Sequence, residues 1–347
     1  MGSLQRNSSG SSRLLNRLVR FATGMHQPVR AFTLSVVIWA AVTATAAAAE
    51  YPTRPIRLIV PFPPGGTTDV LARLIGPKLT EVFKQPVVID NRSGAAGMIG
   101  ADAIAKASGD GHTFGIIIST HAISPALFAK SPFDPVRDFA PITLVISVAN
   151  VISVHPSVPA TSLAELITLA KARPGKLSFG SAGTGTAVHL TGELFKSVAH
   201  VDITHVPYKG GGPALSDLIA GQIPMGVQNI TTIVQFVRGG RIRALGISSL
   251  ERSPALPDVP TVASQGFPGF EAREWYGMVA PGGTPRTIVT RLNQEIVRII
   301  NSPDVRSRLL DLGADIVGDS PDQFGAFIKA ELTKWSKLLK ETGIRLE

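Results

Sequence analysis

The chain has 347 residues, contains no cysteine, and carries a net charge of +9 from 34 Lys and Arg against 25 Asp and Glu. The missing cysteines exclude disulfides, thiolate chemistry and cysteine-based metal sites, and the length favours two domains. The first 49 residues hold five arginines and no acid, so without them the net charge falls to +4. Because no later segment forms the basic stripe that nucleic acid requires, we expect no nucleic-acid partner.

The amino-terminal segment is predicted to be a cleavable export signal. Its arginines are followed by an apolar run from Ala31 to Ala44 and then by AAAAE. A basic region, about 7–15 apolar residues and small residues at a cleavage site describe a signal peptide, whereas a membrane span needs about 20 apolar residues. We expect cleavage near Ala49 and a periplasmic location. An uncleaved anchor is the alternative, and translation could start at Met1 or at Met25.

Strands and helices alternate after Glu50. Continuous apolar strands separated by amphipathic helices favour an α/β fold with a mostly parallel sheet covered on both faces. Ser162 is expected to cap a helix, with Glu165 at the capping-box position. The predicted strands are 56–61, 87–90, 113–119, 143–154, 177–179, 203–206 and 243–248. The predicted helices are 68–83, 95–106, 163–172, 187–198, one after PYKGGGPAL, and 285–300, 303–312 and 321–342.

The order of these elements predicts two lobes with a discontinuous chain path. The long strand at 143–154 and the segment at 273–281 are the candidate crossings between the lobes. Lobe 1 is then residues 50–150 with 273–347, lobe 2 is residues 151–272, and residues 1–49 are the signal peptide.

Two glycine-rich junctions between a strand and a helix lead to a functional prediction. The first is LIVPFPPGGTTDVLARLI, from Leu58 to Ile75, and the second is LSFGSAGTGTAVHLTGELF, from Leu177 to Phe195. The N–H groups of a first helical turn lack intrahelical partners and lie at the positive end of the helix dipole, so each junction can hold a carboxylate or phosphate. A pair of them predicts one anion bound between two similar halves, because domain interfaces are favoured pocket sites.

Most candidate ligand-binding residues lie in these junctions. Prolines stiffen the first bend, and glycines let a ligand approach the backbone closely. The second junction offers hydroxyls and backbone donors with little bulk. The first set is Phe62, Pro63, Pro64, Gly65, Gly66, Thr67 and Asp69, and the second is Ser181, Gly183, Thr184, Gly185, Thr186 and His189.

Two of these residues have alternative interpretations. Asp69 either stabilises the helix dipole by about 0.3–1 kcal/mol, holds the shape of the loop or binds a ligand amino group. His189 either packs and caps within the fold or contacts the ligand.

Further candidates lie outside the junctions. Ser119 and Thr120 end a buried strand, where open α/β sheets bind ligands, although both residue types also cap helices. Tyr208 follows a strand of the second lobe. Gln228 and Asn229 end an apolar run and could contact the distal end of a ligand. Trp275 and Tyr276 lie at a proposed crossing, where an aromatic side chain would form a cleft wall or pack the hinge.

Enzyme chemistry is poorly supported. GTGTAV lacks the third glycine of a dinucleotide fingerprint, because Val188 stands there, and the export signal argues against a nucleotide cofactor. Ser181 lacks the glycine two positions before it that a nucleophile elbow needs. His200 and His205 face opposite sides of a strand and do not easily share a metal ion. We therefore expect no catalysis, no cofactor and no metal.

Six motifs in order resemble the Bug receptors, the extracytoplasmic binding proteins of tripartite tricarboxylate transporters. They are VPFPPGGTTDVLAR, DNRSGAAGMIGADAIAKASGDGHTF, SAGTGTAVHLTGELF, VPYKGGGPALSDLIAGQI, LPDVPTVASQGFPG and EWYGMVAPGGTP. The resemblance spans about residues 52–345. It implies a two-lobed type II periplasmic-binding-protein fold whose two junction loops hold a ligand carboxylate through backbone N–H groups and waters. Ala96 departs from the family pattern, which often has a glycine there.

These observations predict a solute receptor. The resemblance implies that it binds a small organic acid, such as a di- or tricarboxylate, an aromatic acid or an amino acid. It also implies delivery to the permease subunits of a membrane transporter. An alternative is a periplasmic co-receptor that presents the ligand to a membrane sensor, and an NAD-dependent enzyme is a weaker alternative.

Overall fold

Two similar groups of strands join in one curled, mixed sheet within residues 51–127 and 131–342, the part of the chain that the computed structural model describes. The predicted signal peptide, its cleavage site and both candidate start codons lie outside these residues. None of the described helices is both long and apolar enough to span a membrane.

The strand order is the same in both groups. The first half-sheet has the order β2-β1-β3-β9 and the second half-sheet has the order β6-β5-β7-β4. In each, a central strand pairs in parallel with two neighbours and the last strand pairs antiparallel. The first comprises β1 (Ile56–Val60), β2 (Val87–Asn91), β3 (Thr113–Ile118) and β9 (Arg273–Pro281), and the second comprises β4 (Phe139–Val154), β5 (Ser178–Ser181), β6 (Thr204–Pro207) and β7 (Met225–Asn229).

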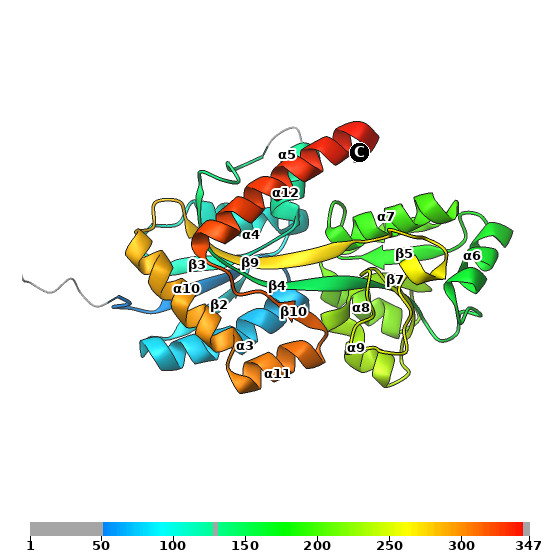
Figure 1. Cartoon of the computed structure of the whole chain (residues 1–347), viewed down its shortest axis with the longest axis horizontal. Helices are drawn as coiled ribbons and strands as arrows, with labels where there is room; N and C mark the ends of the chain where they lie inside the picture. The colour runs from blue at the N-terminus through cyan, green and yellow to red at the C-terminus, as the bar shows by residue number, and fades with distance from the viewer. Residues whose placement is uncertain (1–50, 128–130, 343–347) are drawn as a thin grey trace, which may run out of the picture. The chain divides into compact units, whose positions relative to one another are not determined.

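The long strands β4 and β9 connect the two groups. They pair antiparallel from Phe139↔Pro281 to Ala149↔Arg273, and β4 then continues beside β7. Figure 1 shows both strands running from one group of elements to the other. Two further strands, β8 (Arg243–Ile247) and β10 (Ala314–Ile316), also pair with β4.

Helices follow equivalent strands in the two groups. In the first group α3 (Thr67–Phe83) follows β1, α4 (Met98–Ala105) follows β2 and α5 (Thr120–Leu127) follows β3. In the second, α7 (Ala187–Ala199) follows β5, α8 (Gly211–Ile219) follows β6 and α9 (Ile230–Arg238) follows β7. The other helices are α6 (Leu163–Ala172), α10 (Arg286–Ile300), α11 (Pro303–Asp311) and α12 (Pro321–Thr342), with short 3-10 turns at η1 (Ala95–Gly97) and η2 (Ala263–Gln265).

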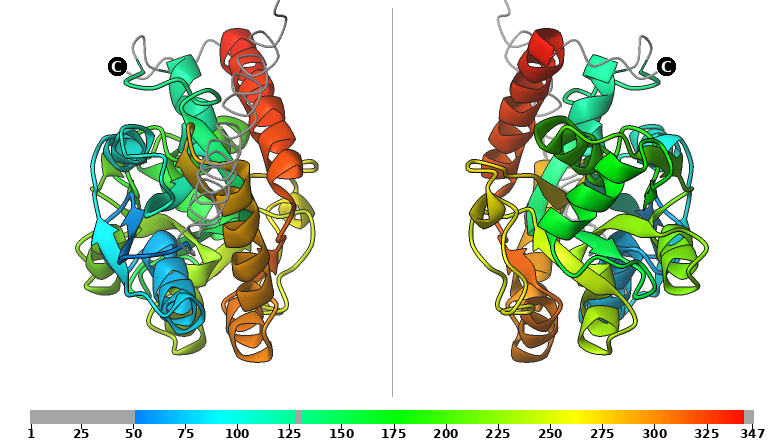
Figure 2. Two further views of the ribbon diagram at one scale, coloured as in Figure 1. Left: turned by 90° about the vertical axis from the view of Figure 1, so that its left-hand side faces the viewer. Right: turned by 90° about the vertical axis from the view of Figure 1, so that its right-hand side faces the viewer.

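Alternation along the strands builds a core on each face of the first half-sheet. Leu58 and Ile116 pack in one apolar cluster with residues of α3 and α10, whereas Ile59 and Ile117 pack in another with residues of α4 and α12. The views in Figure 2 show helices on both sides of the sheet. The predicted α/β fold with helices on both faces is thus confirmed, although the antiparallel β4 and β9 make the sheet mixed.

The structure corrects the predicted elements at several places, and one of them is β4, which begins at Phe139 rather than at residue 143. The helix predicted from residue 95 begins at Met98, because Ala95 and Ala96 have φ of 46° and 53°, which interrupts helical geometry. Helix α8 begins at Gly211, within PYKGGGPAL rather than after it. Ser162 caps α6 and accepts a hydrogen bond from the Glu165 N–H, but the Glu165 carboxylate binds the preceding threonine instead of closing a capping box.

Candidate functional site

The first turns of four helices surround one hollow between the two half-sheets. Its wall includes residues that begin α3, α7, α8 and α9, together with the ends of β3 and β9. The volume of the hollow is about 20 Å³, which is room for about one water molecule. Among the described residues that line it, none is Lys, Arg or His. The lining residues are Phe62, Gly66, Thr67, Thr68, Ile118, Ala182, Thr186, Gly211, Asn229, Thr232, Glu274 and Tyr276.

The first junction is held in shape by Asp69. Its carboxylate accepts hydrogen bonds from the Gly65 N–H at 3.1 Å, from Arg73 at 2.8 Å and from the Asn91 side chain at 3.3 Å. Burial acts to raise the pKa of Asp69, but these hydrogen bonds outweigh it and lower the pKa. An ionised carboxylate behind the loop therefore fixes the start of α3.

Neutral histidines support the second junction. The Gly185 N–H donates to Nδ1 of His189 at 3.1 Å, so this ring nitrogen carries no proton. The His189 ring stacks on His205 at 3.9 Å, and His205 Nε2 lies 2.6 Å from the Ser181 hydroxyl. Burial, followed by the nearby His189 and Lys196, lowers the pKa of His205 to about 3. Both rings are thus uncharged at neutral pH.

The first junction and β9 approach α8 and α9 of the second group through side chains and through backbone. Thr67 and Thr231 share a hydrogen bond of 2.6 Å between their hydroxyls, and the Tyr276 hydroxyl donates to Asn229 Oδ1 at 2.8 Å. A Cβ atom added at Gly212 would lie 2.7 Å from the carbonyl oxygen of Pro64. These contacts cross from the first group of elements to the second and close the hollow.

Thr68 leaves a polar atom without a partner in the wall. Its side chain is 2% exposed, and Oγ1 makes no hydrogen bond although it is buried. A buried hydroxyl without a partner costs free energy unless something binds it. Because Thr68 lies in the first turn of α3, its hydroxyl and the free N–H groups of that turn are suited to the same anionic group.

Among the described residues that line the hollow, Glu274 supplies the one carboxyl group. It lies on β9 and is 2% exposed, and its Oε1 accepts hydrogen bonds from both the Ser119 hydroxyl and the Ser119 N–H. Burial raises the pKa of Glu274 to about 7, against the opposing effect of the Ser119 hydrogen bonds. A group that changes charge near neutral pH therefore faces the hollow.

The predicted site residues fall into three groups. Phe62, Gly66, Thr67 and Thr186 line the hollow. A second group supports the lining segments. Two of its members, Pro63 and Pro64, lie beside Gly210 and Gly212. The others make the hydrogen bonds of the junctions and of Glu274, and they are Gly65, Asp69, Ser119, Ser181, Gly183, Gly185 and His189. The third group, Thr120, Thr184, Tyr208, Gln228 and Trp275, is not in the lining.

Two members of the third group have hydrogen-bond partners elsewhere. Tyr208 donates to Asp217 on α8 at 2.7 Å, and Trp275 donates to Glu331 on α12 at 3.2 Å. Gln228 is buried beside the lining residue Gly211, and its Nε2 has no hydrogen-bond partner. Thr184 is half-buried. Strand alternation explains Trp275: it and Tyr276 point to opposite faces of β9, and Tyr276 faces the hollow.

Sequence reasoning did not select six of the lining residues. It named Asn229 as a contact to the distal end of a ligand and Tyr276 as a cleft-wall or hinge residue, and both line the hollow. Glu274 had no local signal, because its partner Ser119 is 155 positions away. The six are Thr68, Ile118, Ala182, Gly211, Thr232 and Glu274.

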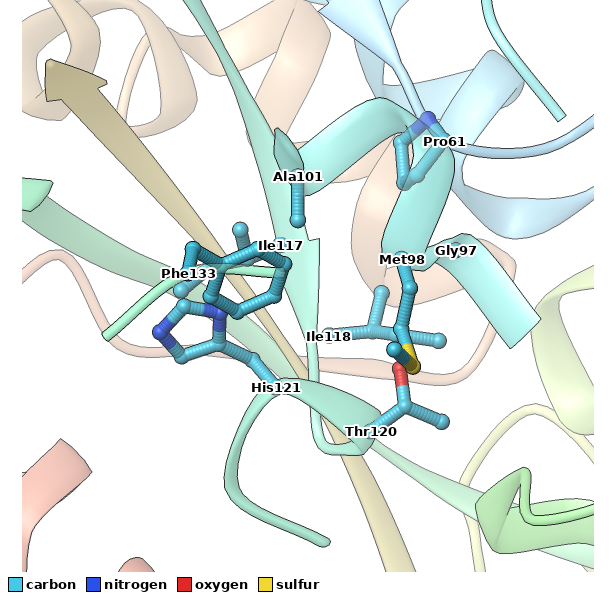
Figure 3. Close-up of a pocket in the computed structure, with 9 residues that line it drawn as sticks. All are labelled: Pro61, Gly97, Met98, Ala101, Ile117, Ile118, Thr120, His121 and Phe133. Carbon is cyan, nitrogen blue, oxygen red and sulfur yellow. The ribbon is translucent and has the colours of Figure 1, made fainter. Parts of the chain in front are cut away.

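Thr120 lines a second, smaller hollow within the first group of elements. Figure 3 shows His121 beneath Phe133 on one side and Met98 with Thr120 on the other. The Thr120 hydroxyl donates to the Ala96 carbonyl, and His121 Nε2 lies 2.8 Å from the Pro135 carbonyl oxygen. Burial lowers the pKa of His121 to about 4. This space is mostly apolar and includes neither junction helix.

Two half-sheets around a hollow formed by helix N-termini define a two-lobed binding protein of the periplasmic type. Residues 71–344 match the sequence model of the tripartite tricarboxylate transporter family receptors, and the chain belongs to this family. This family consists of periplasmic solute-binding receptors and not of enzymes.

Named relatives agree with this assignment. The protein BugT of Bordetella pertussis is 39% identical over 89% of this chain and 95% of its own. An R. palustris protein solved with adipate is 40% identical, with a TM-score of 0.82 over 85% of this chain and 99% of its own. MatC from Rhodopseudomonas palustris, solved with bound malate, is 34% identical, with a TM-score of 0.79 over 83% of this chain and 100% of its own.

Proposed function

We propose that this protein is a periplasmic receptor that holds a small organic carboxylate in the hollow at the starts of α3 and α7. The proposal includes removal of residues 1–49 on export and delivery of the ligand to the permease subunits of a tripartite transporter. The single observation that carries it is the convergence of helix N-termini on a hollow that no described cationic side chain lines. Backbone N–H groups then have to bind the negative charge.

Two further observations support a carboxylate. Thr68 supplies a buried hydroxyl without a partner at the start of α3. Two relatives of at least 34% identity were solved with the dicarboxylates adipate and malate. Both ligands are small anions with carboxylate oxygens that backbone donors recognise.

Ligand entry requires the walls to separate, because the hollow has room for about one water molecule and a dicarboxylate is larger than that. We propose that residues 50–150 with 273–347 form one lobe and residues 151–272 the other, and that the lobes hinge along β4 and β9. Closing them excludes water and strengthens the contacts to the anion.

A ligand screen tests the proposal. The chain from residue 50 onward is mixed with succinate, malate, adipate, citrate, benzoate and glutamate, and binding is followed by thermal shift and calorimetry. Thr68→Val should weaken binding of a carboxylate about tenfold, because one hydrogen bond to a charged group is lost. Thr168→Val on the exposed face of α6 is the matched control and should bind as the parent does. The absence of binding by every acid in the screen would contradict the proposal.

Delivery to a permease has a separate test. Deleting the gene should abolish uptake of the acid that binds most tightly, and restoring the gene should restore uptake. If uptake is unchanged while a membrane sensor stops responding, the co-receptor alternative is favoured instead.

A further inference from the structure

Glu274 gives the hollow a feature that a site for anions does not need. It is a carboxyl group in the wall that the proposed carboxylate ligand would face, and it is 2% exposed. In water two carboxylates repel each other weakly, but in a closed, low-dielectric hollow they cannot both stay ionised. One of the two must hold a proton when the ligand is bound.

The hydrogen bonds of Glu274 show which oxygen is available for that proton. Ser119 donates to Oε1 from its hydroxyl and from its N–H. In the part of the chain that the structure describes, Oε2 accepts no hydrogen bond. Oε2 is thus the oxygen that can carry a proton and donate it to a ligand in the hollow.

The neighbouring elements supply no positive charge to Glu274. β3 and β4 carry no titratable side chain. Helix α7 carries the neutral His189, and Glu193 follows it one turn later. Helix α4 carries Asp102. On β9 itself, burial and the nearby Glu274 raise the pKa of Tyr276 well above its usual value, so this side chain is neutral. These groups are neutral or acidic, so none favours the ionised form of Glu274.

The cations on nearby elements are paired with other acids. Arg273 binds Asp315, Lys106 lies 2.8 Å from its neighbour Asp102 on α4, and Lys196 lies 2.8 Å from Glu193 on α7. Helix α12 contacts β9 through Trp275, on the strand face opposite Glu274. Burial therefore acts on Glu274 without a compensating cation, and it raises the pKa to about 7.

The second half-sheet has a neutral pair at the equivalent place. Ser119 follows β3, and Asn229 ends β7, the strand equivalent to β3. Asn229 Nδ2 donates to Asn150 Oδ1 on β4 at 2.8 Å. An amide pair stays neutral at every pH, whereas the Ser119–Glu274 pair is neutral only when Glu274 is protonated.

We propose that Glu274 is a specificity-determining residue that binds the carboxylate ligand in its protonated form and donates a hydrogen bond from Oε2 to a ligand oxygen. This inference rests on the proposed function. Binding is then accompanied by uptake of one proton from solution when Glu274 starts ionised. The hollow favours ligands that present an acceptor oxygen to Glu274 over ligands that present an ammonium group.

Calorimetry tests this with adipate and malate as probes, which are both fully ionised between pH 7 and 8.5. Titrations at pH 6, 7 and 8.5, each in two buffers of different ionisation enthalpy, give affinity and proton uptake together. Affinity should fall about tenfold per pH unit above pH 7, with uptake approaching one proton at pH 8.5. Glu274→Gln should bind with an affinity independent of pH and without proton uptake, because an amide does not ionise.

Glu331→Gln is the matched control, because this acid contacts Trp275 on the opposite face of the same strand; it should keep the proton uptake of the parent. If Glu274→Gln does not fold, Ser119→Ala replaces it. Loss of a hydroxyl that favours the ionised carboxylate should move the fall in affinity to higher pH.

The outcomes separate the two proposals. Binding of either acid with an affinity independent of pH, or proton uptake that persists in Glu274→Gln, overturns the role of Glu274 and leaves the receptor function intact. Failure of both probes and of every acid in the wider screen contradicts the receptor function, and the inference with it.

Discussion

The two half-sheets have the same strand order and the same helix after each equivalent strand, yet different side chains support their ligand-facing ends. Behind the start of α3 stands the ionised Asp69, whereas behind the start of α7 stand the neutral His189 and His205. The pairs after β3 and β7 differ in the same way, since one contains Glu274 and the other only amides. The shared fold brings the N–H groups together, and the supporting side chains determine how each side responds to pH.

The largest expected effect concerns Glu274 in the protein without ligand. Its folded pKa of about 7 lies above the ordinary glutamate value of 4.5, so the folded state binds more protons than the unfolded state between these values. Stability is therefore lost as the pH rises from 4.5 through 7, by roughly 3 kcal/mol. Glu274→Gln should be more stable than the parent by up to this amount at pH 8.5 and equal to it at pH 4.5 in guanidinium unfolding. A constant difference across this range would show that Glu274 does not titrate as described.

A second change acts on the contact between the halves. Gly212→Ala places a Cβ atom 2.7 Å from the Pro64 carbonyl oxygen, and such overpacking typically costs 1–3 kcal/mol. Because the clash exists only while the first junction is close to α8, we expect a loss of adipate affinity of about 10- to 100-fold with little loss of thermal stability. Gly283→Ala, where the added Cβ meets nothing within 4 Å, is the control. Unchanged affinity in Gly212→Ala would mean that binding does not bring these backbones together.

The histidines of the second junction should make it sensitive to acid. The folded pKa of His205 is about 3, below the ordinary histidine value of 6.5, so its contribution to stability is present above pH 6.5 and is lost as the pH falls. His205→Gln should reduce that loss between pH 6.5 and 4 by roughly 1–2 kcal/mol, a figure that allows for the partial exposure of the ring. Urea unfolding across this range measures it. An identical acid profile in parent and variant would place the acid sensitivity elsewhere, with His189, whose pKa burial also lowers, as the next group to replace.

The smallest expected effect concerns a single hydroxyl pair. Thr231→Val removes the 2.6 Å hydrogen bond to Thr67, which should reduce stability by about 1 kcal/mol. Adipate affinity should fall less than tenfold, because the Thr67 N–H group remains in place. Thr333→Val on the exposed face of α12 serves as the control in the same unfolding assay. A loss of affinity larger than that of Thr68→Val would show that the cross-junction bond matters more than direct donors to the ligand.

Local sequence patterns predicted the backbone of the site but not its deeper wall. Both junctions were recognisable because glycine and proline punctuate an apolar strand just before an amphipathic helix, and α3 and α7 begin within one residue of the predicted positions. The helix at 95–106 began too early in the prediction, since nothing local distinguishes an alanine in left-handed geometry, such as Ala96, from a helical alanine.

Residues brought together by strand pairing were beyond local patterns. Which of Trp275 and Tyr276 faces the hollow depends on the pairing of Tyr276 with Ile118 across β3 and β9. The partner of His205 proved to be His189 on α7, a contact between two elements that spacing along one strand does not reveal. Glu274 is a further case, because its partner comes from the end of another strand.

A crystal structure of the protein with adipate tests the central claim most directly. We predict density for a carboxylate group between the starts of α3 and α7, with its oxygens within hydrogen-bond distance of backbone N–H groups from both junctions and of the Thr68 hydroxyl. Adipate bound outside this hollow, or held by a lysine or arginine side chain with the two junctions unoccupied, would contradict the account.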